Sequence, residues 1–292
     1  MAGHERIPSP PGRPACAHPA ATAKRQAEET RRLNHRKPSE VCAFGYTFVL
    51  APGFSIRLDS EHSVLLRSFV REQGLAVVID SELQPRWSAW SRLLPCLSAD
   101  AQRVFHNANA GGASHISEAL SMEVLHRAFG ARLGLTELEL IYWPTNGAIT
   151  DFSIELEGTE LGVSVTRAFG YGAELSVAQA EGLLCKKLSG VLASTATSCH
   201  GWKKQLLHIW CRAQADVEIL RLAYTRLAPA LVADTVVLVT LCTNLPELYT
   251  ERGDKACRQP RACKGLKDDE HLRILAESDP LRFTHAMHVQ VQ

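Results

Sequence analysis

The sequence predicts an α/β protein in which helices flank a mixed β-sheet. Two stretches carry this prediction. Between residues 114 and 194, two helical patterns enclose three strand-like runs. At 234–242 the run DTVVLVTLC is continuous and β-branched, which is typical of a strand covered on both faces. A hydrophobic content of 46% with 22% charged residues supplies enough apolar material for a packed core.

Length and charge narrow the class of protein. A chain of 292 residues predicts one large domain, or a core with a smaller appended domain. The net charge of +1 excludes a global attraction to nucleic acid or membrane, so such affinity would need a local patch. The N-terminus lacks the apolar segment of a signal peptide, and the longest apolar run is shorter than the roughly 18 residues of a membrane span. With nine scattered cysteines and no CxxC motif, we expect an intracellular protein of the nucleus or cytoplasm, with no membrane association.

Composition divides the chain into four parts. Residues 1–40 are rich in proline, alanine and basic residues, which predicts a disordered tail. Residues 41–110 predict a small N-terminal α/β extension. The Gly-rich segment NANAGGAS (107–114) marks the linker into the core, which we expect over 111–245. Residues 246–292 are predicted to form a polar C-terminal tail.

Within the extension, the pattern predicts a short strand over 42–53, a helix over 60–74 and a buried strand over 75–80. Trp87 and Trp90 follow at helical i, i+3 spacing. Such a pair can stack on bases, but packing in the core or between domains is the favoured interpretation.

The core is predicted to begin with a helix over 114–130. Two apolar stripes run along it, which is typical of a buried helix. Glu118 projects at the N-terminal end of one stripe, whereas Glu123 and Arg127 have the spacing of an i, i+4 ion pair. Glu118 is therefore the carboxylate in an unusual place. The alternative role for it is a helix-start carboxylate favoured by the macrodipole.

Three strands should follow this helix, over 136–144, 149–157 and 160–170, as an antiparallel meander. A second helix is predicted over 176–194. The next stretch, 199–229, has the pattern of one long helix or a broken pair of helices.

Strand alternation brings polar side chains together. Asp151 falls on the polar side of its strand, and Ser164 and Thr166 fall on the side of theirs that faces away from the core. A tight turn at Gly158 makes these strands a hairpin, so the three side chains can converge. On the second helix, Lys187 flanks the apolar face; it either extends to water over apolar surface or reaches a site on the sheet.

This order of elements and residues resembles the PD-(D/E)xK nuclease superfamily, which includes Holliday-junction resolvases and restriction endonucleases. The resemblance covers about 115–195, with 234–242 as a fourth strand, and implies a restriction-endonuclease-like core. By position, Glu118 matches the helix acid and Asp151 the strand acid that bind divalent metal in that family. The resemblance therefore implies Mg²⁺ or Mn²⁺ as the cofactor of an active protein.

The chain departs from the family at the (D/E)xK position, which falls on Ser164-Val165-Thr166 and holds neither the acid nor the lysine. The resemblance implies that Ser164 and Thr166 order water and that Lys187 replaces the missing lysine from the neighbouring helix. Arg167 is a weaker substitute, because an arginine cannot give up its proton.

Two functions remain open at this point. The first is a metal-dependent nuclease-like protein that acts on or binds DNA or RNA. The second is a catalytically inactive nuclease-fold protein that serves as a binding or scaffolding module and acts through protein or nucleic-acid contacts. A third reading is an unrelated α/β protein in which 160–167 is simply a core strand. Predicted nucleic-acid contacts are Arg167, Lys203 and Lys204; amphipathic packing explains the two lysines equally well.

Overall fold

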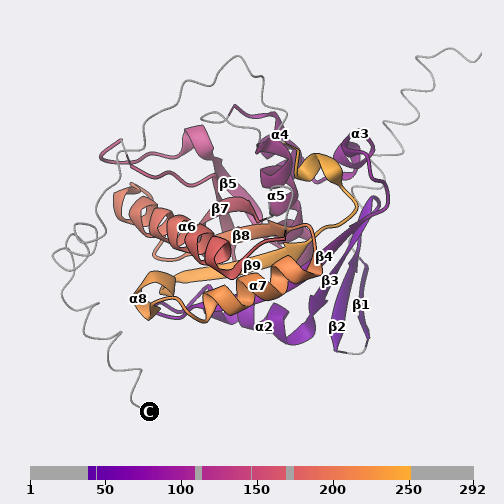
Figure 1. Cartoon of the computed structure of the whole chain (residues 1–292). Coiled ribbons are helices and arrows are strands. Elements are labelled where there is room, and N and C mark those ends of the chain that lie inside the picture. Colours follow the sequence, from indigo (N-terminus) through magenta and orange to yellow (C-terminus); the bar gives the residue numbers. More distant parts are fainter. Residues whose placement is uncertain (1–38, 44, 109–113, 146, 169–173, 251–292) are drawn as a thin grey trace, which may run out of the picture. The chain divides into compact units, whose positions relative to one another are not determined.

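A nine-stranded mixed sheet organises the structure, a computed structural model that describes residues 39–43, 45–108, 114–145, 147–168 and 174–250 (Figure 1). The described residues belong to one compact unit. From edge to edge the strands are β1 (Ser39–Ala43), β2 (Tyr46–Leu50), β3 (Phe54–Asp59), β4 (Val77–Pro85), β9 (Thr235–Leu241), β8 (Gln205–Cys211), β7 (Thr159–Ala168), β6 (Phe152–Leu156) and β5 (Arg132–Thr136). The predicted class, a mixed sheet flanked by helices, is confirmed.

The centre of the sheet is parallel and its margins are antiparallel. Strands β4, β9, β8 and β7 run parallel to one another. The strands outside them pair antiparallel. Every residue of β8 and β9 is buried, as expected for parallel strands with both faces covered. Because β4 pairs with β9, the segment 41–110 completes this sheet instead of forming a separate extension.

Different helices cover the two faces. The helices are α2 (Ser60–Phe69), α3 (Trp90–Leu93), α4 (Ala99–His106), α5 (His115–Phe129), α6 (Val177–Thr197), α7 (Gln214–Tyr224) and α8 (Pro229–Val232). Figure 1 shows α6 and α7 in front of the central strands, with α5 behind them. Each helix therefore buries a different set of strand side chains, because alternate residues of a strand point to opposite faces.

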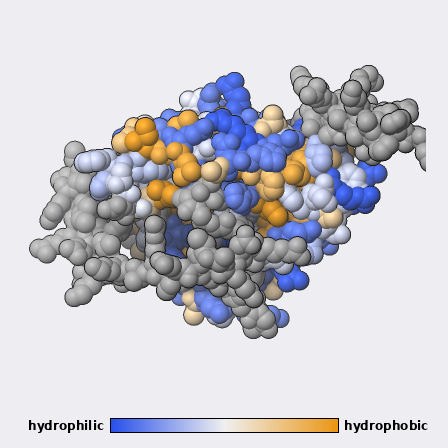
Figure 2. All heavy atoms as spheres, turned by 90° about the horizontal axis from the view of Figure 1, so that it is seen from above, coloured by the Kyte–Doolittle hydropathy of each residue, from blue (hydrophilic) through white to orange (hydrophobic). Residues whose placement is uncertain are grey.

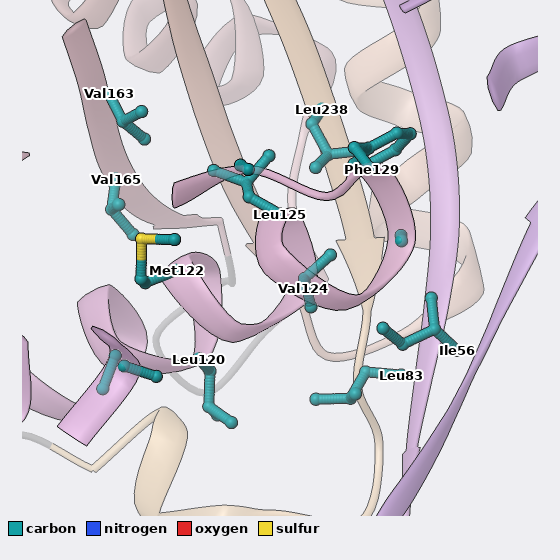
Figure 3. Close-up of a cluster of buried hydrophobic side chains, with 14 of the residues drawn as sticks. Ile56, Leu83, Leu120, Met122, Val124, Leu125, Phe129, Val163, Val165 and Leu238 are labelled. Atoms are coloured by element: carbon teal, nitrogen blue, oxygen red, sulfur yellow. The ribbon is translucent and has the colours of Figure 1, made fainter. Parts of the chain in front are cut away.

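Helix α5 lies at the centre of the larger core. Twelve of its fifteen residues are buried, which confirms the helix with two apolar stripes. Figure 3 shows Leu125 and Phe129 beside Leu238 of β9, and Met122 beside Val165 of β7. This packing fixes the helix, and with it the carboxylate of its first turn, against the sheet.

Helix α6 covers the opposite face with the apolar side that the sequence predicts. Its buried residues include Ala180, Leu184, Leu188 and Val191, which confirms that face. Ser176 caps the helix and forms a capping box with Gln179. The same core includes apolar residues of β8, α7 and β9.

The prediction of helix over 199–229 is wrong in its first half. Strand β8 and helix α7 occupy this stretch. The segment QLLHIWC is buried along its whole length, and a central strand covered on both faces lacks the polar alternation that marks a half-exposed strand. Short apolar runs of this kind do not separate strand from helix by periodicity.

Three other boundaries differ from the prediction. The run expected as a strand over 136–144 is the end of β5 followed by a 3-10 turn, Glu137–Glu139. The single strand expected over 42–53 is parts of two strands, and β3 follows them. Residues 246–250 pack onto the core through Leu248 and Tyr249, so no tail begins at 246.

Part of the chain lies outside the described residues: 1–38, most of the predicted linker (109–113), and 251–292, which includes most of the predicted C-terminal tail. In the part that is described, no helix is long and apolar enough to cross a lipid bilayer. On the face shown in Figure 2, apolar residues form separate groups among polar ones.

Candidate functional site

Asp151 is held at the beginning of β6 by two hydrogen bonds to β7. Its backbone N–H donates to the Val163 carbonyl at 3.1 Å, and its Oδ2 accepts from the Val165 N–H at 2.6 Å. Phe152 pairs with Val163, so one step further along the antiparallel ladder Asp151 lies opposite Ser164. The carboxylate is half-buried and has a fixed position.

Glu118 enters the site from the first turn of α5. Only 4% of it is exposed, and its backbone N–H donates to the Ser114 carbonyl at 3.0 Å. Burial raises the pKa of Glu118, and a hydrogen bond from Ser114 opposes that rise. The negative charge of Glu137 raises this pKa further, whereas the charge of Arg167 lowers it. Glu118, which the sequence placed unusually at the end of an apolar stripe, is thus a buried carboxylate with charged neighbours.

The negative charge of Glu118 acts on the carboxyl of Asp151. Burial is the largest cause that raises the pKa of Asp151, to about 8, and the negative charge of Glu118 is the second. The Val165 N–H and the positive charge of Lys187 oppose this rise. The structure therefore brings together three of the residues that the sequence singles out: an acid on α5, an acid at β6 and a lysine on α6.

The two adjacent lysines of α6 differ in exposure to solvent. Lys187 is half-buried and near Asp151, whereas Lys186 is exposed. Ser164 and Thr166, on the β7 face toward α6, are both half-buried. Both hydroxyls are therefore on the side of the sheet from which Lys187 approaches.

Glu137 also contributes to the electrostatics of Glu118 and Asp151, although the sequence patterns did not single it out. Thr136, the last residue of β5, pairs with Phe152. Glu137 and Asp151 are the neighbouring residues on the two antiparallel chains, so Glu137 lies on the Asp151 side of this pair. Its charge raises the pKa of both Glu118 and Asp151. The sequence pattern placed Glu137 within a strand over 136–144, whereas it begins a 3-10 turn. The capping box between Thr136 and Glu139 is the local signal that marks a turn there.

The three residues predicted to contact nucleic acid lie in different surroundings. Arg167 is half-buried, and its Nη1 donates to the Leu248 carbonyl at 3.3 Å. Lys203 is exposed. Lys204 is only 3% exposed, and its ammonium donates to the carbonyls of Phe69 at 2.5 Å and Leu75 at 2.7 Å. Lys204 therefore stabilises the end of α2 and is not a nucleic-acid contact.

Glu118 and Asp151 offer carboxylate oxygens, the type of ligand that Mg²⁺ prefers. Across the described residues, no three or more His, Cys, Asp or Glu side chains are grouped to hold a metal ion. Mg²⁺ does not need such a cage, because it is usually bound through one or two carboxylates, with waters and substrate phosphates as its other ligands. The charge of Glu118 disfavours ionisation of Asp151, and a divalent cation would offset this effect.

Comparison with known proteins gives one relative and no family. The chain is 34% identical over 209 residues to the "AAC-rich mRNA clone AAC4 protein" of Dictyostelium discoideum. This alignment covers 69% of the chain but 30% of the relative, so the chain spans less than a third of that protein's length. No protein-family model matches the chain, and no solved structure matches it.

Proposed function

We propose that this protein is a metal-dependent nuclease-like enzyme that cleaves phosphodiester bonds in nucleic acid. The observation that carries the proposal is the gathering of charges around Asp151, where Glu118 raises the pKa of the carboxyl and Lys187 lowers it. Glu118 on α5, Asp151 just before β6 and Lys187 on α6 match two of the acids and the lysine of PD-(D/E)xK nucleases, whereas the acid of the (D/E)xK position has no counterpart.

Glu118 and Asp151 are the proposed ligands of Mg²⁺ or Mn²⁺. When bound, the cation supplies a Lewis acid that activates water and neutralises charge on the phosphate. Asp151 presents its carboxylate in one orientation, because the Val165 N–H holds Oδ2. Glu118 offers the second carboxylate from a helix that the core holds in place. Preorganised ligands of this kind need no rearrangement when the substrate binds.

Lys187 is the proposed charge-stabilising group. Its ammonium acts on Asp151 from α6, on the sheet face that carries Ser164 and Thr166. In this role it donates hydrogen bonds to the phosphate oxygens while the two hydroxyls order the attacking water. The lysine that β7 lacks would thus be supplied by α6.

A second candidate is a binding module with the same fold and no catalysis. The observation that favours it is the sequence of β7, where Ser164-Val165-Thr166 holds neither an acid nor a lysine. In that case the nucleic acid or protein partner binds without being cleaved. For either function we propose a location inside the cell, in the nucleus or cytoplasm.

Cleavage by the full chain tests the proposal. Single-stranded, duplex and branched DNA and RNA are incubated with the protein in Mg²⁺, in Mn²⁺ and in EDTA. We expect metal-dependent cleavage that Asp151→Asn reduces by at least about 100-fold, because changes outside the ligand shell of a metal site already cost 10–100-fold.

Glu160→Gln is the matched control, since Glu160 is an exposed carboxylate on β7, the strand whose Val165 N–H donates to Asp151. It should cleave like the unmodified protein. Equal cleavage by Asp151→Asn and the unmodified protein would refute the site. No cleavage by a folded sample would favour the binding module.

A further inference from the structure

We propose that Arg86, Trp87 and Arg92 form a surface that binds the phosphate backbone of nucleic acid away from the candidate catalytic site. We call these three residues the Arg–Trp–Arg surface. Nucleic acid is named as the ligand on the basis of the proposed function. The binding itself needs neither the metal nor catalysis.

Two guanidinium groups gather over one ring in this surface. The Cζ atom of Arg86 lies 5.4 Å from the centroid of the Trp87 ring, and that of Arg92 lies 5.8 Å from it. Both arginines are exposed, and Trp87 is half-buried. A guanidinium over an aromatic face keeps N–H donors for a second partner, and phosphate oxygens match these donors in geometry and charge.

The two arginines differ from most others in the described part of the chain. Neither forms an ion pair with a carboxylate of the described residues. Arginines that do so are Arg57, Arg67, Arg71, Arg103, Arg127, Arg132, Arg221 and Arg226. With a net charge of +1, the chain needs a local patch of this kind to attract a polyanion.

The backbone around the surface is held in place. The Arg86 N–H donates to the Gly53 carbonyl at 2.8 Å. Trp90 is buried against Phe105, with ring centroids 5.0 Å apart, and the backbone N–H of Trp90 donates to the Glu247 carboxylate at 3.3 Å. The two tryptophans, which the sequence treated as a pair, therefore have different roles. Trp90 anchors the segment, and Trp87 packs against the two arginines.

Sheet topology places this surface and the candidate site at different levels along the parallel strands. Arg86 directly follows the carboxyl end of β4, and Asp151 contacts the carboxyl-terminal half of β7 at Val165. β4 and β7 run in the same direction with β9 and β8 between them. Through the paired residues of these strands, Val165 lies level with Ile79 of β4, seven residues before Arg86. Seven residues at about 3.3 Å each, and three strand spacings of about 4.8 Å, therefore separate the two features. Contact with both would therefore need a strand of several nucleotides, and a dinucleotide is too short.

Binding without metal tests the inference. A fluorescently labelled single-stranded oligonucleotide of about 20 nucleotides is titrated in EDTA with the full chain and with Arg86→Gln/Arg92→Gln. We expect at least a tenfold loss of affinity at low salt. The slope of log affinity against log salt should become shallower by about 1.4, because each phosphate contact to a single strand contributes roughly 0.7.

The control pair is Arg132→Gln/Arg226→Gln, which removes two exposed arginines that are already paired with carboxylates. Its affinity and salt slope should stay unchanged. Arg86→Lys/Arg92→Lys keeps the charge and should recover part of the affinity. The thermal unfolding midpoint of each variant confirms that it is folded.

Three results would overturn the inference: no binding by the unmodified chain, an unchanged salt slope in Arg86→Gln/Arg92→Gln, or displacement of the oligonucleotide by an acidic polypeptide at equal charge concentration. The last result would make the surface a contact for acidic protein segments. Failure of the proposed catalysis appears differently, as binding with the expected salt slope but no cleavage in Mg²⁺ or Mn²⁺.

Discussion

The Oδ2 atom of Asp151 lies 2.6 Å from the backbone nitrogen of Val165, so a carboxylate at the start of β6 is fixed to the middle of β7. This bond holds Asp151 beside Glu118 and Lys187, whose charges act on its pKa in opposite directions. The hydrogen bond depends on the register between β6 and β7. Asp151 is the residue on which most of the predictions below depend.

Replacing Asp151 should change how stability depends on pH. The pKa of Asp151 is raised to about 8 in the folded protein, above its ordinary value near 3.8. The stability that this group contributes is therefore complete below pH 3.8 and is lost as pH rises through 8. Because Asn cannot ionise, the free energy of unfolding of Asp151→Asn relative to the unmodified protein should increase from pH 5 to pH 9.

Urea unfolding at several pH values measures this difference. Glu160→Gln provides the comparison, since it removes an exposed carboxylate. A stability difference between Asp151→Asn and the unmodified protein that stays constant from pH 5 to pH 9 would show that the carboxyl of Asp151 titrates normally.

Lys187→Met should lower the rate of cleavage by roughly 10²–10³-fold, the range for loss of one positioned donor that stabilises charge in the transition state. The positive charge of Lys187 lowers the pKa of Asp151, so its removal should also move the pH dependence of the remaining activity to higher pH. The profile of rate against pH measures both effects. Lys186→Met, at the exposed neighbouring position, should match the unmodified protein; similar losses in the two variants would remove Lys187 from the site.

Glu123→Gln should destabilise the fold by about 3–5 kcal/mol, because it leaves a buried charge without its partner. Glu123 Oε1 lies 2.8 Å from Arg127 Nε, and their side chains are 0% and 3% exposed. Glu123 Oε2 also accepts from the Ser98 N–H at 2.7 Å. Chemical unfolding measures the loss. Glu123→Gln/Arg127→Met should cost less than the sum of the single changes; simple additivity would mean that the two side chains do not interact.

Replacing Lys203 and replacing Lys204 should have different effects on stability. Lys204→Met removes charged hydrogen bonds to Phe69 and Leu75, so it should lower the free energy of unfolding by about 1.5–3 kcal/mol and leave nucleic-acid affinity unchanged. Lys203→Met should leave stability unchanged, since Lys203 is exposed. Unfolding and oligonucleotide binding are measured on both variants. Weaker binding by a folded Lys204→Met would contradict the placement of its ammonium in the interior.

Local patterns predicted most of the helices that pack against the sheet. The two stripes of α5 and the apolar face of α6 are periodic, and each helix buries the residues that its period indicates. Strand β8 was missed because a strand buried on both faces has no alternation to show. The place of β4 beside β9 was also out of reach, since nothing local relates Val77 to Val236.

The candidate site divides in the same way. Glu118 and Asp151 stand out locally, one by its place on a helical wheel and the other by its place on a strand. Glu137 joins them only through the pairing of β5 with β6. The Lys203-Lys204 pair has one charge pattern but two environments, which depend on how α2 meets β8.

Binding of Mn²⁺ tests the central claim most directly, because it asks whether Glu118 and Asp151 hold a divalent cation before any substrate is involved. Isothermal titration calorimetry compares the full chain with Asp151→Asn, Glu118→Gln and Glu160→Gln. The proposed site predicts saturable binding by the unmodified protein and Glu160→Gln, and affinity at least about tenfold weaker in the other two variants. Equal binding by all four proteins, or binding by none of them, would contradict it.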